Sequence, residues 1–220
     1  MNIICLYWVG KFRNRDFTVK DVVRLRESVD KHIDTPYTFY CLTNAVNSEI
    51  PAEKIMLKHN WPGWWSKIEL HRQDLPKGRT LYLDLDSHVI RPLAPLLEHK
   101  GDLVMFETKT PRFRRVQKPK IVQRYQAATM LFTPGKLAWI YDKFRKNPNI
   151  YMAKYRSDQD IMGEWIPNQP LFPGECMKKL SSCVNTNTPP EDVIIVTGQP
   201  KSESFRNPAT IPWLEPMARG

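Results

Sequence analysis

Apolar positions along the chain follow two different periods, which alternate from one end to the other. Residues 2–9 form a continuous apolar run rich in β-branched and aromatic side chains, as expected for a strand buried on both faces of a parallel sheet. From 19 to 33 apolar residues recur at helical spacing, and Thr18 with Asp21 forms a capping box at the start of this segment. The chain therefore begins with a strand and an amphipathic helix.

The same alternation predicts the remaining elements. Alternating strands and helices are typical of an α/β fold with a mainly parallel sheet flanked by helices, whose ligands bind beyond the carboxyl ends of the strands. No internal repeat and no clear linker interrupts the order, so one domain is expected. Further strands are predicted at 36–42, 55–57, 80–86, 102–106, 127–132 and 193–196, and further helices at 65–75, 137–144 and 157–165.

The composition is that of a globular protein. Apolar residues make up 41% of the 220 residues and there are seven Trp, so the chain can bury a core and wholesale disorder is excluded. No apolar run approaches the roughly 20 residues that span a bilayer, and the first run lacks the basic segment that opens a signal peptide. The four cysteines form no Cys-x-x-Cys pair, so we expect reduced thiols and a cytoplasmic location.

An excess of basic residues favours a polyanionic partner. The chain has 33 Lys and Arg against 23 Asp and Glu, a formal charge of +10, which suits phosphorylated small molecules, anionic lipid or nucleic acid. The segment 109–124 holds seven basic residues and no acid. It predicts a loop that closes on a diphosphate or makes peripheral contact with an anionic membrane, with a solvated basic loop as the alternative. No specific nucleic-acid binding is expected, because no recognised nucleic-acid motif is present.

Two carboxylates end the clearest predicted strand. Over the predicted strand 80–86, Tyr82, Asp84 and Asp86 share one face. The Cα atoms of the two aspartates then lie about 6.6 Å apart, and two unit charges at that distance repel by roughly 2.5 kcal/mol at an effective dielectric of 20. A Mg²⁺ or Mn²⁺ ion that bridges to a diphosphate would remove the repulsion, whereas the alternative is a strand end that runs out into solvent. A second pair, Asp158 and Asp160, begins a helix, where the helix dipole alone favours carboxylates.

An ordered series of motifs runs from residue 2 to about 202. This series resembles the GT-A nucleotide-sugar glycosyltransferases, most closely glycosyltransferase family 8, which contains glycogenin and bacterial lipopolysaccharide galactosyltransferases. The opening also resembles small bacterial or phage members of this group. The resemblance implies a single GT-A (Rossmann-like) domain over 1–202, followed by a Pro-rich C-terminal tail over 203–220. The motifs are Trp-Ser-Lys-Ile-Glu-Leu at 65–70, Leu-Tyr-Leu-Asp-Leu-Asp at 81–86, Ala-Ala-Thr-Met-Leu-Phe at 127–132, Ser-Asp-Gln-Asp at 157–160 and Val-Thr-Gly-Gln-Pro-Lys at 196–201.

Donor-binding roles follow from this resemblance position by position. Asp84 and Asp86 match the metal-binding carboxylates of the family, and Asp84 also lies near the donor ribose. Lys67 matches the lysine that contacts the donor sugar or phosphates, and Lys201 the lysine that holds the diphosphate. These groups suit a leaving diphosphate, because cation and ammonium charge then stand where negative charge develops.

Further roles at the donor sugar are implied in the same way. Asp158 and Gln159 match the Asp-Gln pair beside the anomeric carbon, and we assign them as the catalytic residues. Gln126 falls where the family often has Asn near the sugar. Ala127 and Ala128 stand where small hydroxyl residues or glycine are common, so some sugar contacts are absent.

One departure from the family pattern concerns the third metal ligand. Thr197 stands where the family has His, and a threonine hydroxyl is a much poorer metal ligand. His88 continues the alternation of Asp84 and Asp86 and is a candidate substitute, although a lone His beyond a strand is more often solvated.

The predicted function is therefore metal-assisted transfer of a sugar from a nucleoside-diphosphate donor, with Mn²⁺ or Mg²⁺ as cofactor. A UDP-sugar donor and retention of configuration are the expectation from the family. The acceptor is a hydroxyl group of a glycan, of a lipid-linked molecule or of a protein. The alternative, left open by Thr197, is a non-catalytic nucleotide-sugar or glycan-binding module with a decayed metal site.

Overall fold

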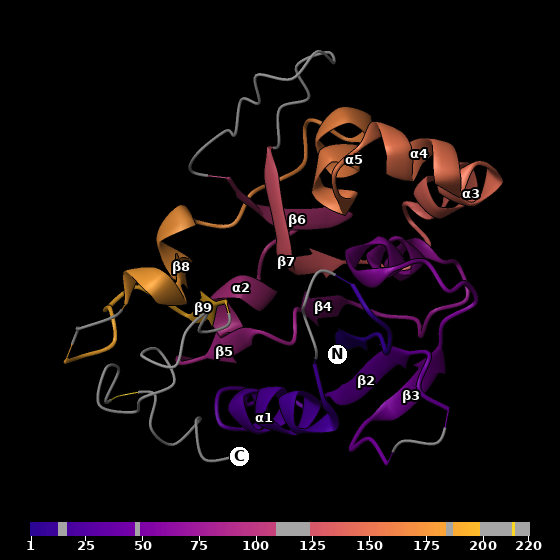
Figure 1. The fold of residues 1–220 in the computed structure, drawn as a ribbon. Coiled ribbons are helices and arrows are strands. Elements are labelled where there is room, and N and C mark those ends of the chain that lie inside the picture. Colours follow the sequence, from indigo (N-terminus) through magenta and orange to yellow (C-terminus); the bar gives the residue numbers. More distant parts are fainter. Residues whose placement is uncertain (13–16, 47–48, 109–123, 184–186, 199–212, 214–220) are drawn as a thin grey trace.

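A six-stranded sheet forms the centre of the computed structural model, which describes residues 1–12, 17–46, 49–108, 124–183, 187–198 and 213 (Figure 1). β1 pairs in parallel with β2 and β4, and β2 with β3, whereas β7 runs antiparallel to both of its neighbours. The mainly parallel α/β sheet predicted from the sequence is thus confirmed. In order across the sheet, the strands are β3 (Glu53–Met56), β2 (Thr38–Thr43), β1 (Asn2–Tyr7), β4 (Thr80–Leu83), β7 (Tyr125–Phe132) and β6 (Leu103–Glu107).

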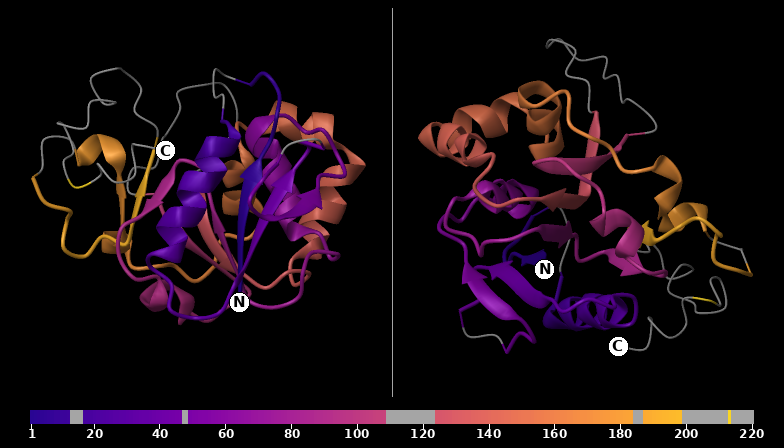
Figure 2. Two further views of the ribbon diagram at one scale, coloured as in Figure 1. Left: turned by 90° about the horizontal axis from the view of Figure 1, so that it is seen from below. Right: turned by 180° about the vertical axis from the view of Figure 1, so that it is seen from behind.

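Two layers of helices cover the two faces of this sheet (Figure 2). Successive residues of β1 point to opposite faces, so Ile3 and Cys5 pack with α1 on one side while Ile4 and Leu6 pack with η1, α3 and α5 on the other. This division explains why β1 is apolar without a break. The helices are α1 (Val19–Asp30) and α2 (Ala94–Leu97) on the first side, and the 3-10 helix η1 (Gly63–His71), α3 (Ala138–Lys146), α4 (Pro148–Lys154) and α5 (Asp158–Trp165) on the second.

A second, three-stranded sheet lies beside the first. It consists of β5 (Ser87–Val89), β9 (Ile195–Thr197) and β8 (Met177–Lys179), with short 3-10 helices at Gly174–Cys176 (η2) and Leu180–Ser182 (η3). β5 and β9 pair antiparallel, with Ser87 opposite Thr197. This pairing brings the late strand of the chain beside the residues that follow β4. A small separate core, against which Trp213 packs, stabilises this sheet.

Several predicted boundaries need correction. The strand predicted at 80–86 ends at Leu83, because the chain turns at 85–86 to enter β5. The predicted helix at 65–75 is a 3-10 helix that ends at His71. The short elements β5, β8, α2 and α4 were not predicted.

Two predictions about the chain as a whole receive partial answers. In the described ranges, the structure contains no helix with both the length and the apolar character that crossing a bilayer requires. The basic segment up to 123 and most of the predicted tail, 203–220, lie outside the described residues, so the domain boundary near 202 stays a prediction.

Candidate active site

Lys67 occupies the centre of the site, although it sits on a helix that is buried almost all round. Its ammonium group forms an ion pair with Asp84, 2.6 Å from Oδ1 and 2.9 Å from Oδ2, and donates to the carbonyl of Ala127 at 3.3 Å. It also lies 5.5 Å from the centre of the Tyr82 ring. Lys67 is 8% exposed, so its positive charge acts in a poorly solvated environment, where it is stronger than in water.

The turn after β4 presents the two carboxylates that the sequence predicted as metal ligands. Asp84 continues the ladder to β7, because its N–H donates to Ala128 O at 2.8 Å. Its side chain accepts a short hydrogen bond from the Tyr82 hydroxyl, so these two residues share a face as predicted. Asp86 lies beyond the strand end, 8% exposed, and its carbonyl accepts from Gly198 N at 2.9 Å.

Asp158, the first residue of α5, completes the charged centre. Burial raises the pKa of its carboxyl to about 6, while the Lys67 ammonium and the peptide N–H of Gln159 oppose the rise. Burial alone would lower the pKa of Lys67, but the charges of Asp84, Asp158 and Asp86 hold it above its ordinary value. Three carboxylates therefore surround one ammonium group among the described residues. Grouped carboxylates of this kind favour a divalent cation.

The donor set fits a hard cation incompletely. Asp84 and Asp86 offer carboxylate oxygens, the ligands that Mg²⁺ and Mn²⁺ prefer. β9 places Thr197, which the sequence predicted in the position of a third ligand, beside this turn. Within the described ranges, no three His, Cys, Asp or Glu side chains are grouped so that they could hold one ion, and His88 is thus not grouped with Asp84 and Asp86. Two carboxylates with open positions remain, a set that suits a cation which also binds the phosphates of a substrate.

His88 instead lies on β5, a strand that packs beside α1. It is 8% exposed, and burial together with the charge of Arg24 lowers its pKa to about 3. The imidazole is therefore neutral at physiological pH. The prediction of a solvated histidine was wrong, because β5 pairs with β9 and encloses this side chain.

An aromatic pocket adjoins the carboxylates at the carboxyl ends of β1 and β4. Trp8, Phe12 and Trp64 line it together with Lys67 and Asp84. Phe12 meets Trp64 edge to face at 4.6 Å between ring centres, and Trp8 donates to Asn60 Oδ1 at 3.1 Å. An aromatic wall beside a charged centre suits a ligand that has a flat base at one end and phosphates at the other.

Gly63 makes this wall possible. Its φ of 55° lies in the left-handed region, and a Cβ at this position would lie 2.0 Å from the Phe12 ring. Any other residue at 63 would require the Phe12 ring to shift. Of the three tryptophans at 61, 64 and 65, the first and last pack in the core below α3, and Trp64 alone lines the pocket.

The remaining predicted site residues have mixed outcomes. Gln126 is half-buried on β7. It lies two residues before Ala128, whose carbonyl accepts from Asp84 N, so β7 carries it near Asp84. Gln159 follows Asp158 on α5 and is also half-buried. Lys201 lies outside the described residues. The sequence thus predicted four groups that the fold brings together, namely Lys67, Asp84, Asp86 and Asp158.

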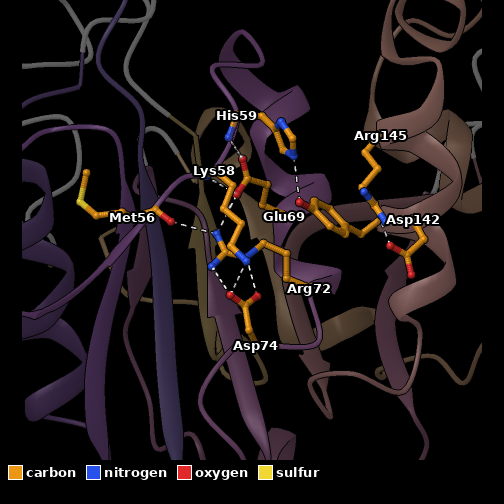
Figure 3. A network of polar contacts seen from close by, with 9 residues as sticks. Met56, Lys58, His59, Glu69, Arg72, Asp74, Asp142 and Arg145 are labelled. Carbon is orange, nitrogen blue, oxygen red and sulfur yellow. Dashed lines mark hydrogen bonds and ion pairs between the residues drawn. The ribbon is translucent and has the colours of Figure 1, made fainter.

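The opposite side of η1 carries a second charged cluster, which sequence reasoning missed (Figure 3). The fully buried Glu69 carboxylate accepts from the peptide N–H groups of Lys58 and His59 and from Arg72 Nη1, each at 2.8 Å. Arg72 also donates to Met56 O at 2.9 Å and pairs with Asp74 at 2.8 Å. Every carboxylate oxygen and guanidinium nitrogen in this cluster has a partner, so its role is structural.

Comparison with known proteins gives the fold. No family model and no curated protein matches the chain. Among solved structures, the galactosyltransferase LgtC in complex with donor and acceptor sugar analogs has a TM-score of 0.67 and 15% identity, over 99% of this chain and 95% of that one. The glycosyltransferase GlyE of Streptococcus pneumoniae TIGR4 has a TM-score of 0.68 and 12% identity, with 100% and 60% covered. The bifunctional glycosyltransferase WbbM has a TM-score of 0.61 and 12% identity, with 98% and 50% covered.

These matches extend over nearly the whole chain, although this chain spans only about half to three fifths of WbbM and GlyE. At such low identity they establish the fold and leave residue roles to the geometry. The chain has the GT-A fold of these glycosyltransferases, as its motif series predicted.

Proposed function

We propose that the protein is a glycosyltransferase that moves a sugar from a nucleoside diphosphate, most simply UDP, to a hydroxyl group of an acceptor. The observation that carries the proposal is the joint position of the carboxylates around Lys67 and the aromatic pocket. Both lie at the carboxyl ends of strands, where α/β folds bind their ligands. The fold shared with sugar transferases supports the same reaction class.

The aromatic pocket takes the nucleobase in this proposal. Trp8 and Phe12 offer flat surfaces for stacking, and Asp84, which lines the same pocket, would accept a hydrogen bond from a ribose hydroxyl. The diphosphate then extends toward Asp86 and Lys67. Because bases of every kind have a π-face, stacking alone selects a nucleotide without selecting uracil.

Asp84 and Asp86 would hold the divalent cation. Such an ion neutralises the negative charge that develops on a leaving diphosphate. Lys67 supplies a fixed positive charge on the same side, since its ion pair with Asp84 holds the ammonium in place. Tyr82 holds Asp84 from the other side through its hydroxyl.

Asp158 and Gln159 would stand at the sugar. An ionised Asp158 carboxylate stabilises positive charge that develops on the anomeric carbon as the bond to the diphosphate breaks. Gln126 and the Gln159 amide would orient sugar hydroxyls. The proposal includes retention of configuration at the anomeric carbon, because the motif series resembles glycosyltransferase family 8. The acceptor is a glycan, free, lipid-linked or on a protein.

The test is calorimetric titration of UDP into the protein with Mn²⁺ and again with EDTA. We expect binding that depends on the metal, and release of UDP from a UDP-sugar donor. Asp86→Asn should weaken the metal-dependent binding, whereas Asp142→Asn serves as the matched control, since Asp142 is an exposed carboxylate on α3 that pairs with Arg145. Absence of binding to any nucleoside diphosphate would refute the proposal.

A second candidate function is a binding module that no longer catalyses transfer. The observation that favours it is Thr197, which supplies no strong third ligand beside Asp86. UDP binding that is equal in Mn²⁺ and EDTA, with no release of UDP from any donor, would select this candidate.

A further inference from the structure

The turn that carries Asp84 and Asp86 is fixed through its backbone at four points. Three of them are peptide hydrogen bonds: Asp84 N to Ala128 O at 2.8 Å, Ser87 N to Asp84 O at 3.0 Å and Gly198 N to Asp86 O at 2.9 Å. The fourth is the carbonyl of Leu85, between the two carboxylates, which accepts a short hydrogen bond from Arg24 Nη2. Only this fourth point depends on a side chain, so a substitution can remove it alone.

Arg24 reaches the turn from α1, on the far side of the sheet from Lys67. Its side chain is 20% exposed, and its Nη1 lies 3.3 Å from Asp21 Oδ1. Asp21 in turn accepts from the N–H of Thr18 at 2.8 Å through its second oxygen. The guanidinium therefore pairs with Asp21 of the helix cap through Nη1 and donates to the Leu85 carbonyl of the turn through Nη2.

The Leu85 side chain explains why the contact matters. Leu85 is 1% exposed and packs in the core beside α1. A buried carbonyl that loses its donor carries the full desolvation penalty of an unpaired polar group. Rotation of the peptide planes in the turn would then lower this penalty. Such a rotation would also redirect the side chains of Asp84 and Asp86, which flank Leu85.

Arg26 offers a comparison within the same helix. It also donates to a peptide carbonyl, Pro51 O at 2.6 Å, and pairs with an aspartate of α1, Asp30 at 3.7 Å. Pro51 lies before β3, at the edge of the sheet away from the carboxylates. The two arginines thus make the same kinds of contact, one at the candidate site and one outside it.

We propose that Arg24 is a positioning residue that sets the direction of the Asp84 and Asp86 carboxylates by holding the Leu85 carbonyl. The inference rests on the proposed function, because it concerns how these carboxylates hold a cation and a diphosphate. Arg24 touches neither ligand. Groups that orient metal ligands from behind typically change metal affinity by about 10- to 100-fold when they are removed.

The experiment compares Arg24→Gln and Arg26→Gln in the full chain. Free Mn²⁺ is followed by its electron paramagnetic resonance signal during titration with UDP present, and the melting temperature of each variant is recorded. Arg24→Gln should weaken Mn²⁺ binding at least about tenfold. Arg26→Gln should bind Mn²⁺ and UDP as the parent protein does, with whatever loss of melting temperature its own contact causes.

Each outcome bears on the inference. Parent-like Mn²⁺ and UDP binding by Arg24→Gln would overturn it, and so would an equal loss in Arg26→Gln, which would indicate a general effect of α1. If Arg24→Gln does not fold, Arg24→Lys replaces it. A lysine offers a point charge in place of the planar fork that spans Asp21 and Leu85, so weaker binding is still expected and parent-like binding overturns the inference. A parent protein that binds neither UDP nor Mn²⁺ refutes the proposed function itself.

Discussion

Two buried charge clusters share the 3-10 helix η1, and they differ in how their charges are arranged. Around Glu69, two peptide N–H groups and Arg72 satisfy one carboxylate, and Asp74 takes up the rest of the guanidinium (Figure 3). Around Lys67, one ammonium faces three carboxylates, and burial leaves the pKa of Asp158 near 6. The first cluster is saturated, while the second gathers several carboxylates around one cation.

The helix geometry explains how one short element serves both. With three residues per turn, side chains two positions apart project about 120° from each other. Lys67 therefore points to the turn after β4 while Glu69 points to the segment before η1. The difference teaches that burial of charge alone does not mark a functional site. A cluster of carboxylates with a perturbed pKa beside a pocket does.

The largest expected effect comes from the saturated cluster. Glu69→Gln removes the negative charge beside Arg72, whose side chain is 5% exposed, and leaves a buried guanidinium with one partner fewer. Breaking a buried pair in this way lowers the free energy of unfolding by about 3–5 kcal/mol. Urea denaturation measures this loss. UDP binding, measured below the melting temperature, should stay at the parent level.

The control is Asp142→Asn, which breaks an exposed pair with Arg145 on α3. Its effect should stay below about 1 kcal/mol. A loss of this small size in Glu69→Gln would contradict the structural role, and a loss of UDP binding in the folded variant would erase the contrast between the clusters.

Asp158→Asn should have the opposite effects to Glu69→Gln, because it should raise stability and lower turnover. The pKa of Asp158 is raised by burial from 3.8 to about 6, so the ionised form destabilises the folded state above pH 6 and this penalty fades as the pH falls toward 4. The variant should therefore be more stable than the parent by about 1–3 kcal/mol at pH 7 and gain little at pH 4. Release of UDP from a donor should fall by about 10²-fold or more.

Denaturation curves at the two pH values and a UDP-release assay measure both quantities. A variant that is less stable at pH 7 and retains turnover would place Asp158 with Glu69 among the structural carboxylates. That outcome would remove the contrast on which the functional interpretation depends.

The sequence predicted the cluster around Lys67 better than the saturated cluster around Glu69, for a physical reason. Asp84, Asp86 and Asp158 stand at element ends, where a chain pattern and a family resemblance both locate ligands. Glu69 and Arg72 read as ordinary members of a helix, and their partners at Lys58 and His59 are peptide N–H groups, which leave no trace in side-chain identity.

The fold was predictable where the hydrophobic pattern is clear. β1 and α1 follow clear patterns, and both formed as expected. The alternation of apolar and polar residues continues from β4 through 86, so the turn at 85–86 that leads into β5 escaped prediction. Arg24 gave no signal at all, because a helical arginine near the surface is normal and its partner is a backbone carbonyl.

His71, the last residue of η1, gives a further dependence of stability on pH. Burial lowers the pKa of His71 to about 4, below its ordinary value of 6.5. The neutral form is therefore favoured in the folded state, and stability is lost as the pH falls from 6.5 to 4, by about 3 kcal/mol. His71→Gln should flatten this part of the curve.

The slope will not vanish entirely, because burial also lowers the pKa of His88 to about 3 and this residue acts in the same direction. Asp158 acts in the opposite direction, since its destabilising charge is lost on acidification. The measurement is the free energy of unfolding in urea between pH 4 and 7 for the parent and the variant. Identical curves would show that His71 is solvated in solution.

The smallest effect tests where the saturated cluster ends. Lys58 pairs with Asp74 at 2.6 Å, but the two side chains are 51% and 48% exposed. Solvent and salt screen such a pair, so Lys58→Gln should lower the free energy of unfolding by less than about 1 kcal/mol, and the difference should shrink further in 1 M salt. The main-chain N–H of residue 58 still donates to Glu69 in this variant, so the buried part of the cluster remains intact. A loss comparable to that of Glu69→Gln would instead mean that the cluster acts as one unit out to its exposed rim.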